Sequence, residues 1–228
     1  NMLANEYIPD DTDVLGGTLD LLREIMFAPL TENGAFKKEY VDGEKRNQID
    51  SIKAMINNKN SYAVWRCQEE MCRGELYSVP NSGTVEQVEA ITPASLYEFY
   101  KKIIVTAPVE IYFVGKCDFG ALESGLRDIF TPYAHNAGEL PPTQVIRTAG
   151  ELREFTEDQP VTQGKLSIGF RTAKVLADGD YHKFVMFCEI FGGSPSSKLF
   201  MNVREKLSLC YYCQAIPHAQ KGIMIVAS

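Results

Sequence analysis

The sequence lacks an excess of positive charge, a long hydrophobic run and a dense set of cysteines. Its 23 lysines and arginines stand against 30 aspartates and glutamates, a net charge of −7, which argues against a nucleic-acid-binding surface. No apolar stretch approaches the roughly 20 residues of a membrane helix, and no signal-peptide pattern opens the chain. Six cysteines in 228 residues are too few for a disulfide scaffold. We therefore expect a cytoplasmic protein with reduced thiols and with neither nucleic-acid nor membrane partners.

Hydrophobic periodicity predicts helices through most of the first 130 residues. Helical spacing of apolar residues, helped by capping residues, predicts helices near 18–28, 36–57, 61–76, 92–104 and 118–129. The run VEIYFVG, Val109–Gly115, is rich in β-forming residues and predicts a central strand. Helices in a row beside a strand indicate an α+β fold, with a helical layer on one face of a sheet.

A linker is predicted over residues 131–150, TPYAHNAGELPPTQVIRTAG, because this stretch has adjacent prolines, glycines and no periodicity. Beyond it, KLSIGF (165–170) alternates apolar with polar or small residues, the pattern of a half-buried strand. A helix is expected over Tyr181–Phe191, and the closing residues GIMIVAS are expected to form a strand. The expected domains are therefore 1–130 and 151–228, and we expect the chain to be part of a longer protein.

One stretch, SSKLFMNVREKLSLCYY (Ser196–Tyr212), predicts a short amphipathic helix that runs directly into a strand. Arg204 falls at the end of that helix, and Tyr211 follows in the alternating run LCYYCQAI. Both side chains donate hydrogen bonds, so two packed elements would present them to one acceptor. The simpler alternative is an exposed helix-end arginine and a strand tyrosine in the core.

Two neighbouring motifs have simpler explanations than binding. Cys210 and Cys213 form a C-x-x-C motif, but residues three apart on a strand point to opposite faces, so we do not expect them to share a metal. Gly192, Gly193 and Ser194 precede a helix start and would suit an anion loop. A helix stop followed by a turn explains the same glycines.

Several blocks occur along the chain in the order found in one family: FAPLTENGAF, VDGEKRNQID, VEAITPASLYEFYKK, VEIYFVGKCD, QGKLSIGFRT and FGGSPSSKLFMNVREKLSLCYYC. They resemble the pitrilysin and insulysin class of zinc peptidases, which includes the mitochondrial processing peptidase and its bacterial relatives. The resemblance implies two homologous α/β halves, with antiparallel sheets covered by helices, that close around an extended peptide. Residues 1–130 would be the C-terminal part of a first half, and 151–228 the N-terminal part of a second.

The same resemblance implies roles for particular residues. Arg204 and Tyr211 match the pair with which the second half reaches the substrate and the developing oxyanion. A glycine-rich substrate contact would fall at Gly192, Gly193 and Ser194. The family's zinc motif, H-x-x-E-H, does not occur, because the three histidines are isolated from one another.

The third zinc ligand of the family also lacks a match. In the family, a glutamate that supports the zinc ligands is followed seven residues later by the ligand glutamate. If the supporting glutamate is aligned with Glu44, the ligand position falls on Ser51. A serine hydroxyl does not replace a carboxylate in a tight zinc site. A shifted alignment would put the ligand on Glu44 or Glu39, but we expect a lost site. Zinc would then belong to the parent protein or its partner.

The expected function is that of a non-catalytic, peptide-binding partner of a zinc endopeptidase, paired with a homologous subunit as a heterodimer or homodimer. One alternative is an intact zinc endopeptidase whose H-x-x-E-H lies upstream of residue 1. A second alternative, from another class, is a scaffolding homologue without a substrate. Under each of them we expect this chain alone to have no peptidase activity.

Overall fold

The computed structural model describes residues 7–8, 12–133 and 138–228. The chain divides into two compact units, Asn1–Arg46 with Glu89–Leu140 and Asn47–Val88 with Pro141–Ser228. These units differ from the expected linear division, because residues 47–88 pack with the last part of the chain. The assignment of 1–130 and 151–228 to two peptidase halves stays a prediction. Within the expected linker, 138–150 form neither helix nor strand, and 134–137 lie outside the described residues.

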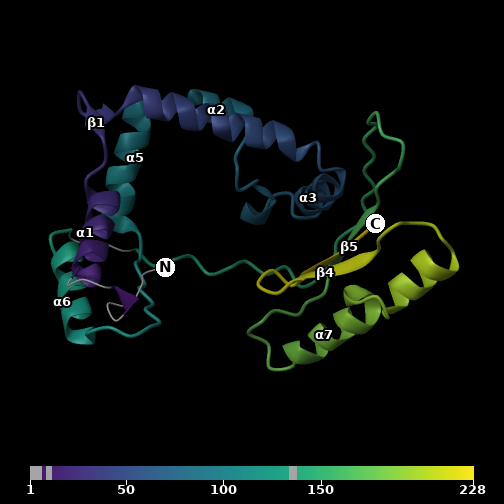
Figure 1. The fold of residues 1–228 in the computed structure, drawn as a ribbon. Helices are drawn as coiled ribbons and strands as arrows, with labels where there is room; N and C mark the ends of the chain where they lie inside the picture. The colour runs from purple at the N-terminus through teal and green to yellow at the C-terminus, as the bar shows by residue number, and fades with distance from the viewer. Residues whose placement is uncertain (1–6, 9–11, 134–137) are drawn as a thin grey trace. The chain divides into compact units, whose positions relative to one another are not determined.

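The first unit is a set of helices with a minimal hairpin (Figure 1). Its elements are α1 (Val14–Phe27), β1 (Thr31–Glu32), β2 (Ala35–Phe36), the first part of α2 (Lys38–Met55), α5 (Pro93–Thr106) and α6 (Phe119–Phe130). Helix α4 (Val85–Ala90) spans the boundary between the units. No helix in the described part of the chain has the length and apolarity that crossing a bilayer requires.

Side-chain caps set where these helices begin. The Thr92 hydroxyl accepts a hydrogen bond from the Ser95 amide at 3.1 Å, and the Asp118 carboxylate accepts one from the Ala121 amide at 3.0 Å, as expected for capping residues. Helix α1 begins four residues earlier than the hydrophobic pattern predicts. The reason is that Asp13 caps it by accepting from the Gly16 amide at 2.8 Å.

The expected strand Val109–Gly115 is absent from the described structure. Its side chains lie open to solvent, with Ile111 50%, Tyr112 84% and Val114 99% exposed. A strand needs a partner for its backbone N–H and C=O groups, and the only sheet described in this unit is the two-residue pairing of β1 with β2. Strand propensity without a partner therefore leaves this segment extended and unpaired.

The second unit is built on a three-stranded antiparallel sheet with the order β3-β5-β4. The strands are β3 (Ser167–Arg171), β4 (Gln214–His218) and β5 (Ile223–Ala227). Helix α3 (Lys59–Met71) contacts β3 and β5, whereas α7 (Tyr181–Cys188) and η3 (Glu189–Gly193, a π-helical turn) contact β4. Figure 1 shows α3 and α7 on opposite sides of this sheet. Helices and antiparallel sheets together confirm the expected α+β class.

One apolar cluster of this unit lies between the sheet and α7, and the fully buried Ile223 and Ile225 of β5 face α3 on the other side. The buried centre of this cluster consists of Cys188, Ala215 and Met224. Partly buried side chains surround this centre: Phe184, Phe191, Leu199 and Val226. Phe187 stacks between Phe184 and Phe191, with ring centroids 6.3 and 5.4 Å away. Because Ala215 and Met224 come from β4 and β5, this cluster holds the central strand β5 and the outer strand β4, which follows Ser196–Tyr212 in the chain.

Strand β3 buries the opposite face from the one that its hydrophobic pattern predicts. Ile168 and Phe170 are 44% and 42% exposed, whereas the small and polar positions between them face α3. A Cβ on Gly169 would lie 2.5 Å from the Met71 sulfur, so α3 approaches the strand closely at this glycine and a larger residue would displace the Met71 side chain. The close approach of α3 decides which face is covered.

A buried ion cluster joins the end of α3 to the sheet. Glu75, which lies between α3 and η2 (Leu76–Ser78), pairs with Arg171 of β3 and with Lys221, whose ammonium lies 2.5 Å from its carboxylate. Arg171 also donates to the Met71 carbonyl at 2.9 Å. Burial by itself raises the pKa of Glu75, but hydrogen bonds from the two cations outweigh it, so the net pKa is lowered. Glu75 is therefore ionised and holds residues 47–88 on the sheet.

A second set of polar contacts fastens the segment 153–159 along α3. Arg66 donates to the Glu157 carboxylate at 2.6 Å, and the Tyr62 hydroxyl donates to the same carboxylate at 2.8 Å. Lys59 donates to the Gln159 side chain at 2.7 Å. These contacts, made between segments far apart in sequence, are a second reason why α3 belongs to the unit that contains the sheet.

Candidate functional site

Arg204 lies in η4 (Phe200–Lys206), a π-helical turn that is tied to the residues following it. The Ser208 amide donates to the Arg204 carbonyl at 3.0 Å, and the Leu209 amide donates to the Val203 carbonyl at 3.1 Å. Ser208 has φ +52°, the left-handed conformation that commonly ends a helix. The chain therefore turns back at Ser208, two residues after η4 ends.

This reversal brings Arg204 and Tyr211 together. The guanidinium lies 5.5 Å from the centroid of the Tyr211 ring and 4.5 Å from that of Phe200, within the range of cation–π attraction. The expected strand at Tyr211 is wrong, since β4 begins only at Gln214. The contact is made by a turn and a bend, because the hydrogen bonds to η4 hold residues 207–209 out of the sheet.

The pair is open to a ligand. Tyr211 is 78% exposed and the Arg204 side chain 34% exposed. Arg204 also lies 3.2 Å from the Glu205 carboxylate, a partly exposed pair of the kind that solvent weakens. A guanidinium and a phenol side by side offer several N–H donors and one O–H donor, which suits a carbonyl oxygen or an oxyanion.

The two glycines of the predicted turn, Gly192 and Gly193, have different environments. Gly192 is buried, and a Cβ there would lie 2.7 Å from the Ala215 nitrogen and 2.8 Å from Leu199 Cδ1. Gly193 is exposed, and Ser194 places its hydroxyl 3.1 Å from that of Ser196. Gly192 is therefore required for packing against β4, and the predicted substrate contact of this turn stays a prediction.

The contact at Gly192 also closes the outer edge of β4. Leu166 and Ser228 exchange two backbone hydrogen bonds, of 3.1 and 2.9 Å. Hydrogen-bonded and non-hydrogen-bonded pairs alternate along an antiparallel ladder. The even-numbered residues of β5 therefore exchange backbone hydrogen bonds with β3, and the odd-numbered ones exchange them with β4. Ala215, opposite Val226, then turns its N–H outward, toward Gly192. A peptide strand has no room to pair there.

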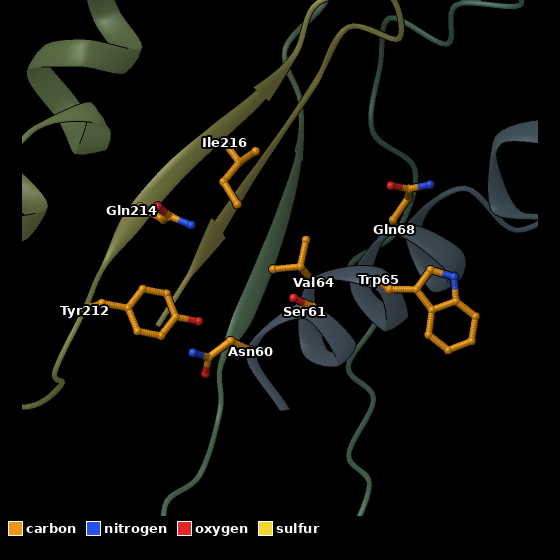
Figure 2. A pocket seen from close by; sticks show the side chains of 8 residues that line it. All are labelled: Asn60, Ser61, Val64, Trp65, Gln68, Tyr212, Gln214 and Ile216. Atoms are coloured by element: carbon orange, nitrogen blue, oxygen red, sulfur yellow. The ribbon is translucent and has the colours of Figure 1, made fainter. Parts of the chain in front are cut away.

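A groove of about 420 Å³ lies between the first turns of α3 and the strand β4 (Figure 2). Its lining consists of Asn60, Ser61, Val64, Trp65 and Gln68 from the helix and Tyr212, Gln214 and Ile216 from the strand side. The helix covers β3 and β5 and leaves this face of β4 bare, which creates the groove. We did not predict the groove from the sequence, although the alternation of Tyr212, Gln214 and Ile216 places them on one face.

The C-x-x-C motif does not lie on a strand, which overturns the premise of the sequence argument. Cys210 and Cys213 both precede β4. Burial raises the pKa of the Cys213 thiol, and the neighbouring Cys210 thiol raises it further. The strand geometry therefore no longer supports the expectation that these two thiols do not share a metal, and that expectation stays a prediction.

The residues expected near a zinc site do not fit the metal. Ser51 is exposed on α2, and its hydroxyl donates to the Asn47 carbonyl at 2.9 Å. Glu44, about two turns earlier on the same helix, is also exposed. Among the described residues no three His, Cys, Asp or Glu side chains form a group able to hold a metal ion. His182 and His218 lie on different elements, and His135 lies outside the described residues.

Comparison with known proteins identifies the family. The family model described as the peptidase M16 inactive domain matches residues 90–227. A Bacillus subtilis protein named probable inactive metalloprotease YmfF is 35% identical over 227 residues, which is 99% of this chain and 53% of that protein. The chain belongs to the peptidase M16 inactive domain family, and the resemblance to pitrilysin-type peptidases is confirmed.

Solved structures agree with this assignment. A conserved protein from Enterococcus faecalis superposes with a TM-score of 0.89 at 32% identity, covering 99% of this chain and 53% of that one. An M16 inactive domain from Pseudomonas fluorescens gives a TM-score of 0.70 at 17% identity, covering 95% of this chain and 52% of that one, a likeness of fold alone. The chain thus spans about half the length of the relatives that it matches.

Proposed function

We propose that this chain is part of a non-catalytic M16-family subunit that binds an extended peptide and assists a homologous zinc-bearing subunit. The single observation that carries the proposal is the contact of the partly buried Arg204 with the exposed Tyr211, two donors held together by η4 and the turn after it. The family membership supports a non-catalytic role, and Ser51 at the expected ligand position supports the loss of a zinc site in this chain. The six free cysteines suit the reducing cytoplasm.

In this role Arg204 and Tyr211 hydrogen-bond the substrate carbonyl oxygen as negative charge develops on it. Donors placed before the reaction stabilise that charge without reorganisation, and removing one such donor typically lowers turnover by about 100- to 1000-fold. The contacts of Arg204 with the rings of Phe200 and Tyr211 restrict the guanidinium to one region. That restriction is what a preorganised donor requires.

The test uses the full-length protein assembled with its catalytic partner subunit. We expect Arg204→Ala and Tyr211→Phe each to lower kcat while leaving the thermal unfolding midpoint unchanged, because both side chains lie at the surface. Lys206→Ala is the matched control, since Lys206 is an exposed cation of the same helical turn and is expected to leave kcat unchanged. Unchanged turnover in both Arg204→Ala and Tyr211→Phe would refute the assignment.

Zinc content separates the proposal from an intact endopeptidase. Atomic absorption of the full-length protein, purified without its partner, is expected to find no zinc. About one zinc per chain would favour a catalytic subunit instead. A photo-crosslinking peptide that labels the partner but never this chain, under turnover conditions, would favour a scaffolding role.

A further inference from the structure

The groove between α3 and β4 combines a polar end with an apolar part. Asn60 and Tyr212 lie at one end, beside Gln214, whereas Val64 and Ile216 lie further along (Figure 2). The volume of about 420 Å³ falls in the range of sites that take one large side chain or a small ligand. An occupant would therefore be a short aliphatic chain that ends in a polar group.

Three polar side chains at that end have no hydrogen-bond partner within the part of the protein that the structure describes. They are the side-chain amides of Asn60 and Gln214 and the hydroxyl of Tyr212. Gln68 differs, because its amide donates to the Tyr77 carbonyl at 2.9 Å. Burial raises the pKa of Tyr212, so its hydroxyl keeps its proton and donates. Two amides and a hydroxyl offer both donors and acceptors.

Among the described residues, those that line the groove carry no charged side chain. The ammonium of Lys165 lies 5.8 Å from the centroid of the Tyr212 ring and donates to the Gln163 side chain at 2.9 Å. The Ser61 amide at the start of α3 is already bonded to the Asn58 side chain at 3.1 Å. A carboxylate in the groove would meet no cation among the lining residues, so any water that it lost would cost free energy. A neutral amide has a smaller cost, because its N–H and C=O groups exchange hydrogen bonds with the side-chain amides of Asn60 and Gln214.

We propose that this groove binds a side chain that ends in a carboxamide, such as glutamine, on an extended peptide. Asn60, Tyr212 and Gln214 bond the carboxamide, and the methylene chain packs on Val64 and Ile216. The inference rests on the proposed peptide-binding function and adds a selectivity to it. Tyr212 follows Tyr211 directly in the chain, so one backbone segment carries both the oxyanion donor and the side-chain pocket.

The test is an NMR titration of the ¹⁵N-labelled chain with two peptides, acetyl-Ala-Ala-Gln-Ala-Ala-amide and the same peptide with glutamate in place of glutamine. We expect the glutamine peptide to shift the side-chain amide signals of Asn60 and Gln214, with an affinity at least about tenfold higher than that of the glutamate peptide. Shifts that avoid these signals, equal affinities, or a preference for the glutamate peptide would each overturn the proposal.

Isosteric variants separate the groove from the rest of the surface. Asn60→Asp and Gln214→Glu place a carboxylate in the groove at exposed positions, where folding is expected to be unaffected, and each should weaken the glutamine peptide about tenfold. Asn81→Asp, exposed and outside the groove, should change nothing. If Asn60→Asp and Gln214→Glu both bind as the unmodified chain does, the assignment is wrong.

The outcomes also separate this inference from the proposed function. Arg204→Ala should leave the titration unchanged, because Arg204 does not line the groove. Loss of turnover in Arg204→Ala without peptide shifts at Asn60 would refute the groove alone. Peptide shifts at the groove together with unchanged turnover in Arg204→Ala would refute the role of Arg204 alone.

Discussion

Replacing Glu75 with glutamine tests the ion cluster that holds residues 47–88 on the sheet. The side chains of Glu75, Arg171 and Lys221 are only 4%, 8% and 5% exposed. Glu75→Gln leaves two buried cations without a counter-charge. Breaking a buried pair in this way costs about 3–5 kcal/mol, a large share of the roughly 5–15 kcal/mol that stabilises an ordinary domain.

The assay is urea unfolding followed by tryptophan fluorescence. Trp65 is the single tryptophan of the sequence and lies on α3, in the same unit as the cluster. We expect the free energy of unfolding to fall by about 3–5 kcal/mol in Glu75→Gln. The control Glu205→Gln removes one partly exposed pair, 3.2 Å long, and is expected to cost about 0–1 kcal/mol.

The pH dependence gives an independent check on the same cluster. The folded-state pKa of Glu75 is lowered from its ordinary value of 4.5, so the folded protein binds this proton less readily than the unfolded chain. The stabilisation by Glu75 is therefore fully present above pH 4.5 and is lost as the pH falls through the folded-state pKa. The difference between the unmodified chain and Glu75→Gln should shrink in that acid range. A loss below about 1 kcal/mol at pH 7, or a difference that grows on acidification, would refute the reasoning.

Two further substitutions give expected outcomes in the same unfolding assay. Gly192→Ala should cost about 1–3 kcal/mol by overpacking against the Ala215 backbone, whereas Gly193→Ala, whose Cβ would meet only a flexible carboxylate, should cost much less; equal losses would contradict the packing role. Burial lowers the pKa of His218 below 6.5, so stability should decline as the pH falls from about 6.5, because the unfolded chain binds the proton more readily. The variant His218→Gln should remove that decline, and a decline of the same size in the variant would assign it to other groups.

Local signals in the sequence predicted elements that are stabilised locally. The caps Thr92 and Asp118 act within their own first turns, so the starts of α5 and α6 were predictable. The central strand expected at Val109–Gly115 was wrong because a strand depends on a partner elsewhere in the chain. The buried face of β3 was wrong for the same kind of reason, since the approach of Met71 to Gly169 decides it.

In the candidate site, too, one part was predictable from the sequence and another part was not. The proximity of Arg204 and Tyr211 was expected on the premise of a helix that continues into a strand, yet a turn at Ser208 achieves it. Their separation of seven residues keeps the two within reach for either geometry. The groove at Asn60 and Gln214 was not predicted, because it exists only where α3 and β4, far apart in sequence, lie side by side.

The contact between Gly192 and Ala215 makes the sheet extendable in one direction only. In the described part of the chain no strand pairs with the outer edge of β3, whereas the other edge is capped by a helical turn. A further strand, from the same protein or from a second copy, would therefore join this sheet beside β3. The capped edge at β4 blocks the open-ended strand stacking to which sheets with two exposed edges are prone.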